Sequence, residues 1–124
     1  MNEVMYKNVD YLIEHGVNVK KSLELFGDID TYNDTLQDFY DGIFAKLEKL
    51  SRFKANVDIA NYAIFAHSIK SDARYLGFEV LYEIAYSHEL RAKEKDVDFV
   101  NANYDKLVEE TNKVIEIVKN YLGK

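Results

Sequence analysis

Apolar residues recur at spacings of three and four along most of this chain, and no proline interrupts them. This spacing places apolar side chains on one face of an α-helix, whereas a half-buried strand needs alternation, and no alternating run of convincing length is present. Proline would kink or end a helix from within, so its absence leaves long helices possible throughout. The sequence therefore predicts an all-α protein.

Two short helices are expected before the long ones. The first is predicted over about Glu3 to Glu14, ending near Gly16. The second begins after Asn18, whose side chain is suited to cap a helix, and ends at Gly27, where a left-handed residue is easily accommodated.

Four long helices follow. The first is expected to be capped by Asp30 or a neighbouring residue, the second to start at Asn56 with Asp58 in its first turn, and Gly77 to end that second helix. Their apolar stripes are predicted to hold, in order, Tyr32, Leu36, Phe39, Ile43, Leu47 and Leu50; Tyr62, Phe65, Ala66, Ile69, Ala73 and Leu76; Leu81, Ile84, Ala85 and His88; and Val100, Tyr104, Leu107, Thr111, Val114, Val118 and Tyr121.

Long amphipathic helices with short connections bury their stripes against one another as an antiparallel four-helix bundle. We therefore expect one domain over residues 1–124, with the short N-terminal helices in about 1–27 and the bundle in about 30–122. The charged outer faces offer no obvious second seam, so the domain is expected to be a monomer.

Composition excludes several classes of function. The net charge of −6 argues against general nucleic-acid binding, and the lack of cysteine excludes disulfides, thiolate nucleophiles and cysteine-based metal sites. No Glu-x-x-His pair of the di-iron bundles is present, nor a phosphate-binding loop or a Gly-rich dinucleotide turn, so no metal or nucleotide site and no kinase activity are expected. With neither a secretory signal nor a membrane-spanning apolar run, we expect a cytoplasmic protein with no membrane partner.

The segment 66–78 places His67 and Lys70 three residues apart, which makes them neighbours on a helix surface. An imidazole beside a fixed positive charge suits a reaction in which histidine attacks phosphorus. At about 100° per residue, His67 points roughly 140° away from the centre of the buried stripe and is predicted to be exposed, with Lys70 and Arg74 on the same side. Small and apolar residues are expected to surround it, namely Ala60, Ala63, Ile64 and Ser71.

The pattern of His67, Lys70, Gly77 and Phe78 resembles the signature of the histidine-containing phosphotransfer family. The segment 16–28 is similar to the opening segment of that family, so the likeness extends over nearly the whole chain from Gly16 onward. The resemblance implies a four-helix bundle that carries a phosphoryl group between receiver domains of a phosphorelay. It implies a phosphocarrier without a cofactor of its own, since Mg²⁺ would belong to the receiver.

The resemblance also implies roles for individual residues. His67 would carry the phosphoryl group on Nε2, Lys70 would neutralise phosphate oxygens, and Glu89, 22 positions after the histidine, would accept a hydrogen bond from Nδ1. Ser71 stands where the family commonly has glycine, and His88 where it usually has an aliphatic residue. The partners implied are response-regulator receiver domains and a hybrid sensor histidine kinase, which would dock around Ala63, Ile64, Ser71 and Arg74.

Other readings of the same residues stay open. An adaptor with the same bundle, which binds a receiver domain or another signalling protein and never accepts phosphate, is the alternative function. Lys70 and Arg74 are also typical of solvated surface charges, and Glu89 is also typical of a surface acid. His88 lies on the apolar stripe, which favours a core position, and His15 follows Glu14 at a helix end, which favours a structural role there.

Overall fold

The structure, a computed structural model, describes residues 7–124, and the secondary structure of this part of the chain consists of helices without strands. The all-α prediction is thereby confirmed. The helices are α2 (Val9–Glu14), α3 (Val19–Phe26), α4 (Ile29–Ala55), α5 (Ile59–Leu76), α6 (Glu79–Lys93) and α7 (Val97–Leu122).

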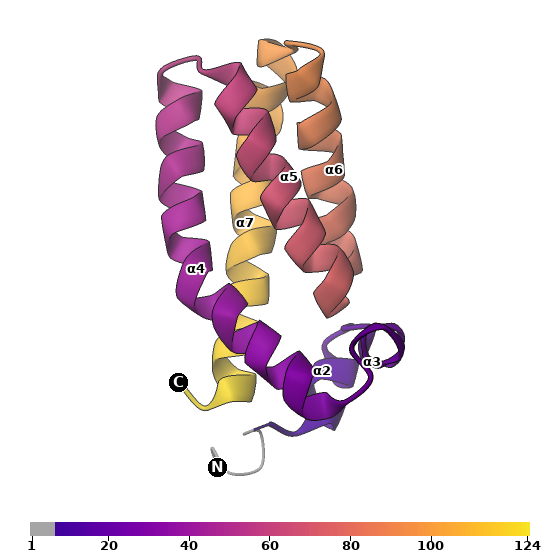
Figure 1. Ribbon diagram of the computed structural model, residues 1–124. Coiled ribbons are helices and arrows are strands. Elements are labelled where there is room, and N and C mark those ends of the chain that lie inside the picture. The colour runs from indigo at the N-terminus through magenta and orange to yellow at the C-terminus, as the bar shows by residue number, and fades with distance from the viewer. Residues whose placement is uncertain (1–6) are drawn as a thin grey trace.

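The four long helices lie side by side and enclose the core (Figure 1). Contacts join α4 to α5, α5 to α6, α6 to α7 and α7 back to α4, while α2 and α3 pack at the end of this group near the C-terminus. None of the helices formed by residues 7–124 has the length and apolar character needed to cross a membrane.

The core between the long helices is formed by the predicted stripes. Leu36, Ile43, Ile69 and Leu107 are fully buried, whereas other stripe members are only partly buried, namely Leu47, Phe65, Ile84 and Tyr104. Buried tyrosines keep their hydroxyl groups paired, since Tyr32 donates to the Leu76 carbonyl at 2.8 Å. Hydrogen bonding of this kind avoids the cost of burying a polar group without a partner.

The structure fixes the start of one predicted helix and corrects the start of another. The cap of α4 is Asp28, a near neighbour of Asp30 as expected, because Asp28 Oδ1 accepts the Thr31 N–H at 2.7 Å. Asn56 does not start α5 but ends α4; Val57 then takes a left-handed φ of 55°, and Asp58 caps α5. The interruption between the two helices is thus a backbone turn that helical spacing does not reveal.

The first short helix is also shorter than predicted. It begins at Val9, because Lys7 has a left-handed φ of 51° and Asn8 is extended and caps the helix through its side chain. The predicted start at Glu3 lies outside the described residues. The second short helix agrees with the prediction at both ends, with Asn18 as its N-cap and Gly27 as its C-cap.

Gly77 brings the C-terminal end of α5 into contact with the N-terminal end of α3. Its φ of 89° lies in the left-handed region, and a Cβ atom built there would be 2.7 Å from the Asn18 carbonyl oxygen. The Asn18 N–H in turn donates to the Gly77 carbonyl at 2.9 Å. Only glycine allows this approach, so Gly77 both ends α5 and fixes the helix that carries His67 against α3.

Candidate functional site

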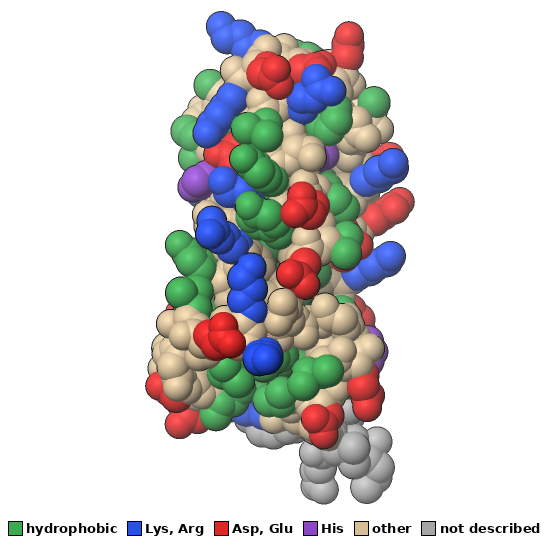
Figure 2. Space-filling view, turned by 90° about the vertical axis from the view of Figure 1, so that its right-hand side faces the viewer, with side chains coloured by type: hydrophobic (Ala, Val, Ile, Leu, Met, Phe, Trp, Pro, Cys, Tyr) green, Lys and Arg blue, Asp and Glu red, His purple; other side chains and the backbone are tan. Residues whose placement is uncertain are grey.

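His67 lies near the middle of α5 with 55% of its side chain exposed. The stripe of α5 that includes Ala66 and Ile69 is fully buried, so the helix turns His67 away from the core. The side of the molecule that α6 occupies is seen in Figure 2, where Lys and Arg side chains lie among exposed hydrophobic ones. The exposure predicted for His67 is what the structure shows.

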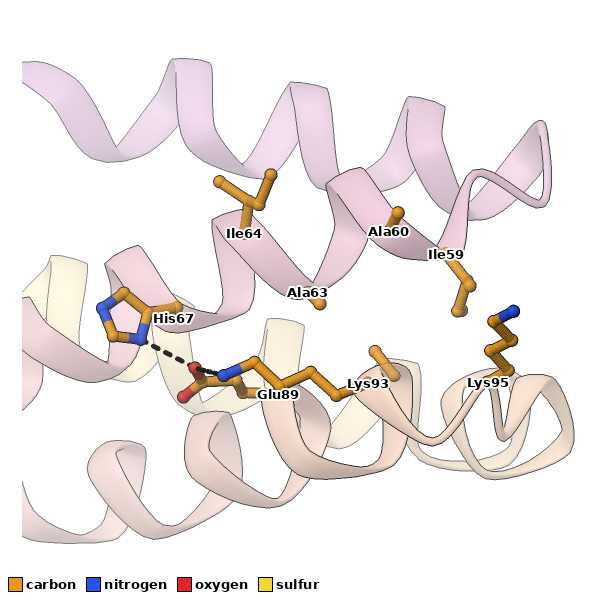
Figure 3. A pocket seen from close by; sticks show the side chains of 9 residues that line it. Ile59, Ala60, Ala63, Ile64, His67, Glu89, Lys93 and Lys95 are labelled. Atoms are coloured by element: carbon orange, nitrogen blue, oxygen red, sulfur yellow. Dashed lines mark hydrogen bonds and ion pairs between the residues drawn. The ribbon is translucent and has the colours of Figure 1, made fainter.

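Glu89 of α6 lies beneath the imidazole of His67. Its side chain is only 2% exposed, and Oε2 is 2.7 Å from Nδ1 of His67 (Figure 3). An ionised carboxylate can only accept a hydrogen bond, so Nδ1 carries the proton and donates it to Oε2. The lone pair of the ring is then on Nε2, for which no hydrogen-bond partner is found within residues 7–124.

Two lysines complete the surroundings of Glu89. Lys70 Nζ is 2.7 Å from Oε1, and Lys93 Nζ is 2.8 Å from Oε2, the same oxygen that faces His67. Lys70 Nζ also lies 5.0 Å from the centre of the Tyr86 ring, within the range of a cation–π contact. From the sequence, Lys70 was expected to contact phosphate and Lys93 was given no role, although the spacing of four between Glu89 and Lys93 is a usual signal for a helical ion pair.

These neighbours keep the carboxyl group of Glu89 in its ionised form. Burial alone raises the pKa of its carboxyl, but hydrogen bonds from Lys70, Lys93 and His67 together outweigh burial and lower the pKa to about 2. Glu89 is therefore ionised at neutral pH. Since two ammonium groups face a single carboxylate, the site carries an excess of positive charge when His67 is neutral, and it favours an anion.

A groove of about 440 Å³ extends from His67 along the first half of α5 and the end of α6 (Figure 3). Its apolar lining is formed by Ile59, Ala60, Ala63, Ile64 and Ala92. Lys93 and Lys95 add positive charge on the α6 side. The groove therefore offers an apolar floor with a cationic margin next to the histidine.

Of the four residues predicted to contact a docked partner, two line this groove and two do not. Ala63 and Ile64 line the groove, but Ala63 is buried while Ile64 is 60% exposed, so only the isoleucine presents much surface. Ser71 and Arg74 do not line it. Arg74 instead lies with Lys21 of α3 beside two other hollows of the surface.

The other two histidines have structural surroundings. His88 is buried: Tyr62 Oη donates to its Nδ1 at 2.9 Å, and its Nε2–H donates to the Asn103 carbonyl at 3.2 Å. Burial lowers the pKa of His88, so it is a neutral core residue. His15 lies at the C-terminal end of α2, where its Nδ1 is 2.7 Å from the Tyr11 carbonyl. Neither combines exposure with a buried carboxylate as His67 does.

The described part of the chain, residues 7–124, contains no group of three or more carboxylate or histidine side chains arranged to hold a metal ion. Comparison with protein-family models, with curated proteins and with solved structures finds no match to this chain. The chemistry available at the site is that of an outward imidazole nitrogen, a buried carboxylate and two ammonium groups.

Proposed function

We propose that this chain is a histidine phosphotransfer protein of a phosphorelay, with Nε2 of His67 as the phosphoryl acceptor. The observation that carries the proposal is the 2.7 Å hydrogen bond between Nδ1 of His67 and buried Glu89. It keeps the proton on Nδ1 and leaves the nucleophilic lone pair on the nitrogen that faces solvent. The resemblance of the segment around His67 to the phosphotransfer family supports the same role.

The reaction needs little from this chain beyond the nucleophile. Nε2 of His67 attacks the phosphorus of an aspartyl phosphate on the receiver domain, the P–O bond to the aspartate breaks, and the carboxylate leaves with the electron pair. The imidazole ring gains positive charge, which the Nδ1–H bond to Glu89 stabilises. Phosphoryl transfer depends mainly on in-line positioning and charge neutralisation, and the receiver supplies Mg²⁺. The step is reversible because the same atoms can pass the group on to a second receiver.

The proposal includes the architecture. We take α4 to α7 as the antiparallel four-helix bundle of a monomeric, cytoplasmic phosphotransfer domain, with α2 and α3 at one end. The contacts that join each long helix to its two neighbours support it. A bundle of this kind holds the histidine on one rigid helix, and Glu89 on the next, at a fixed spacing.

The groove beside His67 is the proposed docking site for the receiver. Ile64 supplies exposed apolar surface there, and Lys93 and Lys95 supply positive charge that complements an acidic partner. Apolar contact at the centre of an interface and charge at its margin are the usual division in protein complexes. The alternative function is an adaptor that binds a receiver without accepting phosphate. The groove is the one observation that favours it, since docking does not need Nε2.

The two functions are distinguished by phosphate transfer from a panel of phosphorylated receiver domains. A phosphotransfer protein becomes labelled, the label is lost in acid, and His67→Gln abolishes it while His15→Gln, which changes an exposed histidine elsewhere, does not. An adaptor binds one of the receivers as a complex but takes no label, and the complex is unaffected by His67→Gln. Labelling that persists in His67→Gln would contradict the proposal.

A further inference from the structure

The two lysines on Glu89 differ in how firmly they are held. Lys70 is only 18% exposed, and its ammonium contacts both Oε1 of Glu89 and the Tyr86 ring. Lys93 is 60% exposed, and within residues 7–124 it forms its ion pair with Oε2. A long side chain that is mostly in solvent, and that is held by one ion pair, exchanges its partner at a lower cost than a half-buried one. Lys93 is therefore free to move, whereas Lys70 is not.

The two carboxylate oxygens also differ. Oε1 is inaccessible to solvent and has no partner in hydrogen-bond geometry within the described part of the chain, so the ammonium of Lys70, 2.7 Å away, compensates its charge as an ion pair. Removal of Lys70 would leave this oxygen buried without a compensating charge, which is strongly unfavourable. Oε2 has two partners, so it keeps the Nδ1–H bond of His67 when Lys93 departs.

We propose a division of labour between these lysines, which rests on the proposed function: Lys93 is the cation that contacts the phosphoryl group on His67, and Lys70 is a positioning residue that acts through Glu89. In the unphosphorylated protein, Lys93 and His67 share Oε2. When Nε2 gains the phosphoryl group, the ring becomes cationic and its Nδ1–H bond to Oε2 strengthens. Lys93 then exchanges Oε2 for a phosphoryl oxygen. No covalent bond of either lysine changes.

This assignment reverses the role expected for Lys70. In the sequence, Lys70 is the lysine next to His67 on the same helix, and direct contact with phosphate is the simplest expectation. In the structure, its ammonium points to the buried side of Glu89, and the exposed ammonium beside the same carboxylate comes from α6. The lysine nearer in sequence is thus the one less available to a group on the outer ring nitrogen.

The test uses the whole chain and phosphoramidate, a small chemical donor that phosphorylates histidine with release of ammonia and needs no receiver. The hydrolysis rate of phosphohistidine and the ¹⁵N shifts of the His67 ring are measured in four proteins: wild type, Lys93→Met, Lys70→Met and Lys113→Met. Lys113 is the matched control, since it is an exposed lysine paired with Glu110 on α7, away from the groove.

Lys93→Met is expected to shorten the life of the phosphohistidine by roughly two- to fivefold, the effect of one exposed ion pair, and to leave Nδ1 protonated before phosphorylation. Lys70→Met leaves the buried carboxylate with one fewer compensating charge, which favours its protonated form. A protonated Glu89 donates to Nδ1 instead of accepting from it, so the ring is expected to shift toward the Nε2–H form, and Lys70→Arg to restore the wild-type tautomer. Lys113→Met should match wild type in both measurements.

The assignment is overturned if Lys93→Met hydrolyses like Lys113→Met. It is also overturned if Lys70→Met shortens the life of the phosphohistidine with the ring tautomer unchanged, because Lys70 would then act on the phosphoryl group itself. If Lys70→Met does not fold, the Lys93 arm decides alone. A chain that phosphoramidate labels as expected but that accepts nothing from receivers would contradict the proposed function while upholding the lysine assignment, and a His67 that takes no label at all would contradict both.

Discussion

Nδ1 of His67 lies 2.7 Å from a carboxylate oxygen of Glu89, although the two residues are 22 positions apart and belong to different helices. The histidine is exposed and the glutamate buried, so the pair connects the surface to the interior of the helix packing. This relationship decides which nitrogen of the ring is available to a partner, and the first two predictions follow from it.

Glu89→Gln should reduce the rate of phosphoryl transfer to His67 by about ten- to a hundredfold, the equivalent of one hydrogen bond to a charged group. An amide still accepts a hydrogen bond from Nδ1, but it carries no charge to stabilise the cationic ring. The rate is measured against a phosphorylated receiver. A Glu94→Gln control, which removes an exposed carboxylate at the end of α6, should behave as wild type. An unchanged rate in Glu89→Gln would contradict the role given to the carboxylate.

Stability should depend on pH through Glu89. Its pKa is lowered from 4.5 to about 2 in the folded protein, so the ionised form stabilises the fold above about pH 4.5, and this stabilisation is lost as pH falls toward 2. A shift of this size corresponds to about 3 kcal/mol. Denaturation of wild type and Glu89→Gln should show the variant less stable at neutral pH, with the gap closing between pH 4.5 and 2. A gap that does not change with pH would contradict the prediction.

Gly77→Ala should destabilise the protein by about 2 kcal/mol or more, because the substitution combines a left-handed backbone with a steric conflict. The new Cβ atom would lie 2.7 Å from the Asn18 carbonyl oxygen. Gly27→Ala is the matched control: its φ of 87° is nearly the same, but nothing lies within 4 Å of the added atom. Chemical denaturation should show a clearly larger loss for Gly77→Ala, and equal losses would mean that the approach of α3 to α5 is unimportant.

The fold should tolerate a charged substitution at Ile64 better than one at Ala63. Ala63 is buried between helices, so a bulky charge there would disturb folding as well as docking. Ile64→Glu should instead weaken receiver binding and transfer while leaving the thermal stability nearly unchanged. Val80→Glu is the control, because Val80 is similarly exposed, 61% against 60%, but does not line the groove. Equal binding by the two variants would move the docking site elsewhere.

The sequence sufficed for the helices and for the orientation of His67, because both follow from the spacing of apolar residues along one helix. Gly77 and Gly27 marked two helix ends for the same local reason. The start of α5 was predicted at Asn56, two residues before its cap Asp58, and the cap of α4 was narrowed only to Asp30 or a neighbour. Several capping residues stand close together at both places, and spacing alone does not choose among them.

The site was harder to predict from the sequence because its residues come from two different helices. Contact of Glu89 with His67 depends on how α5 and α6 pack, and a resemblance rather than periodicity pointed to it. The arrangement of Lys70 and Lys93 around two different oxygens requires the same packing in three dimensions. The groove beside Ile64 has no sequence signal of its own, since its lining comes from both helices and the turn after α6.

Phosphotransfer through His67 is tested by identifying the atom of this chain that accepts phosphate from a receiver domain. NMR of the phosphorylated protein, with ³¹P and ¹⁵N detection, reports both the nitrogen bonded to phosphorus and the position of the remaining ring proton. We expect a single phosphohistidine at His67, with phosphorus on Nε2 and the proton on Nδ1 facing Glu89. Phosphorus on Nδ1, on His15 or on His88, or no phosphorylation by any receiver that binds the chain, would contradict it.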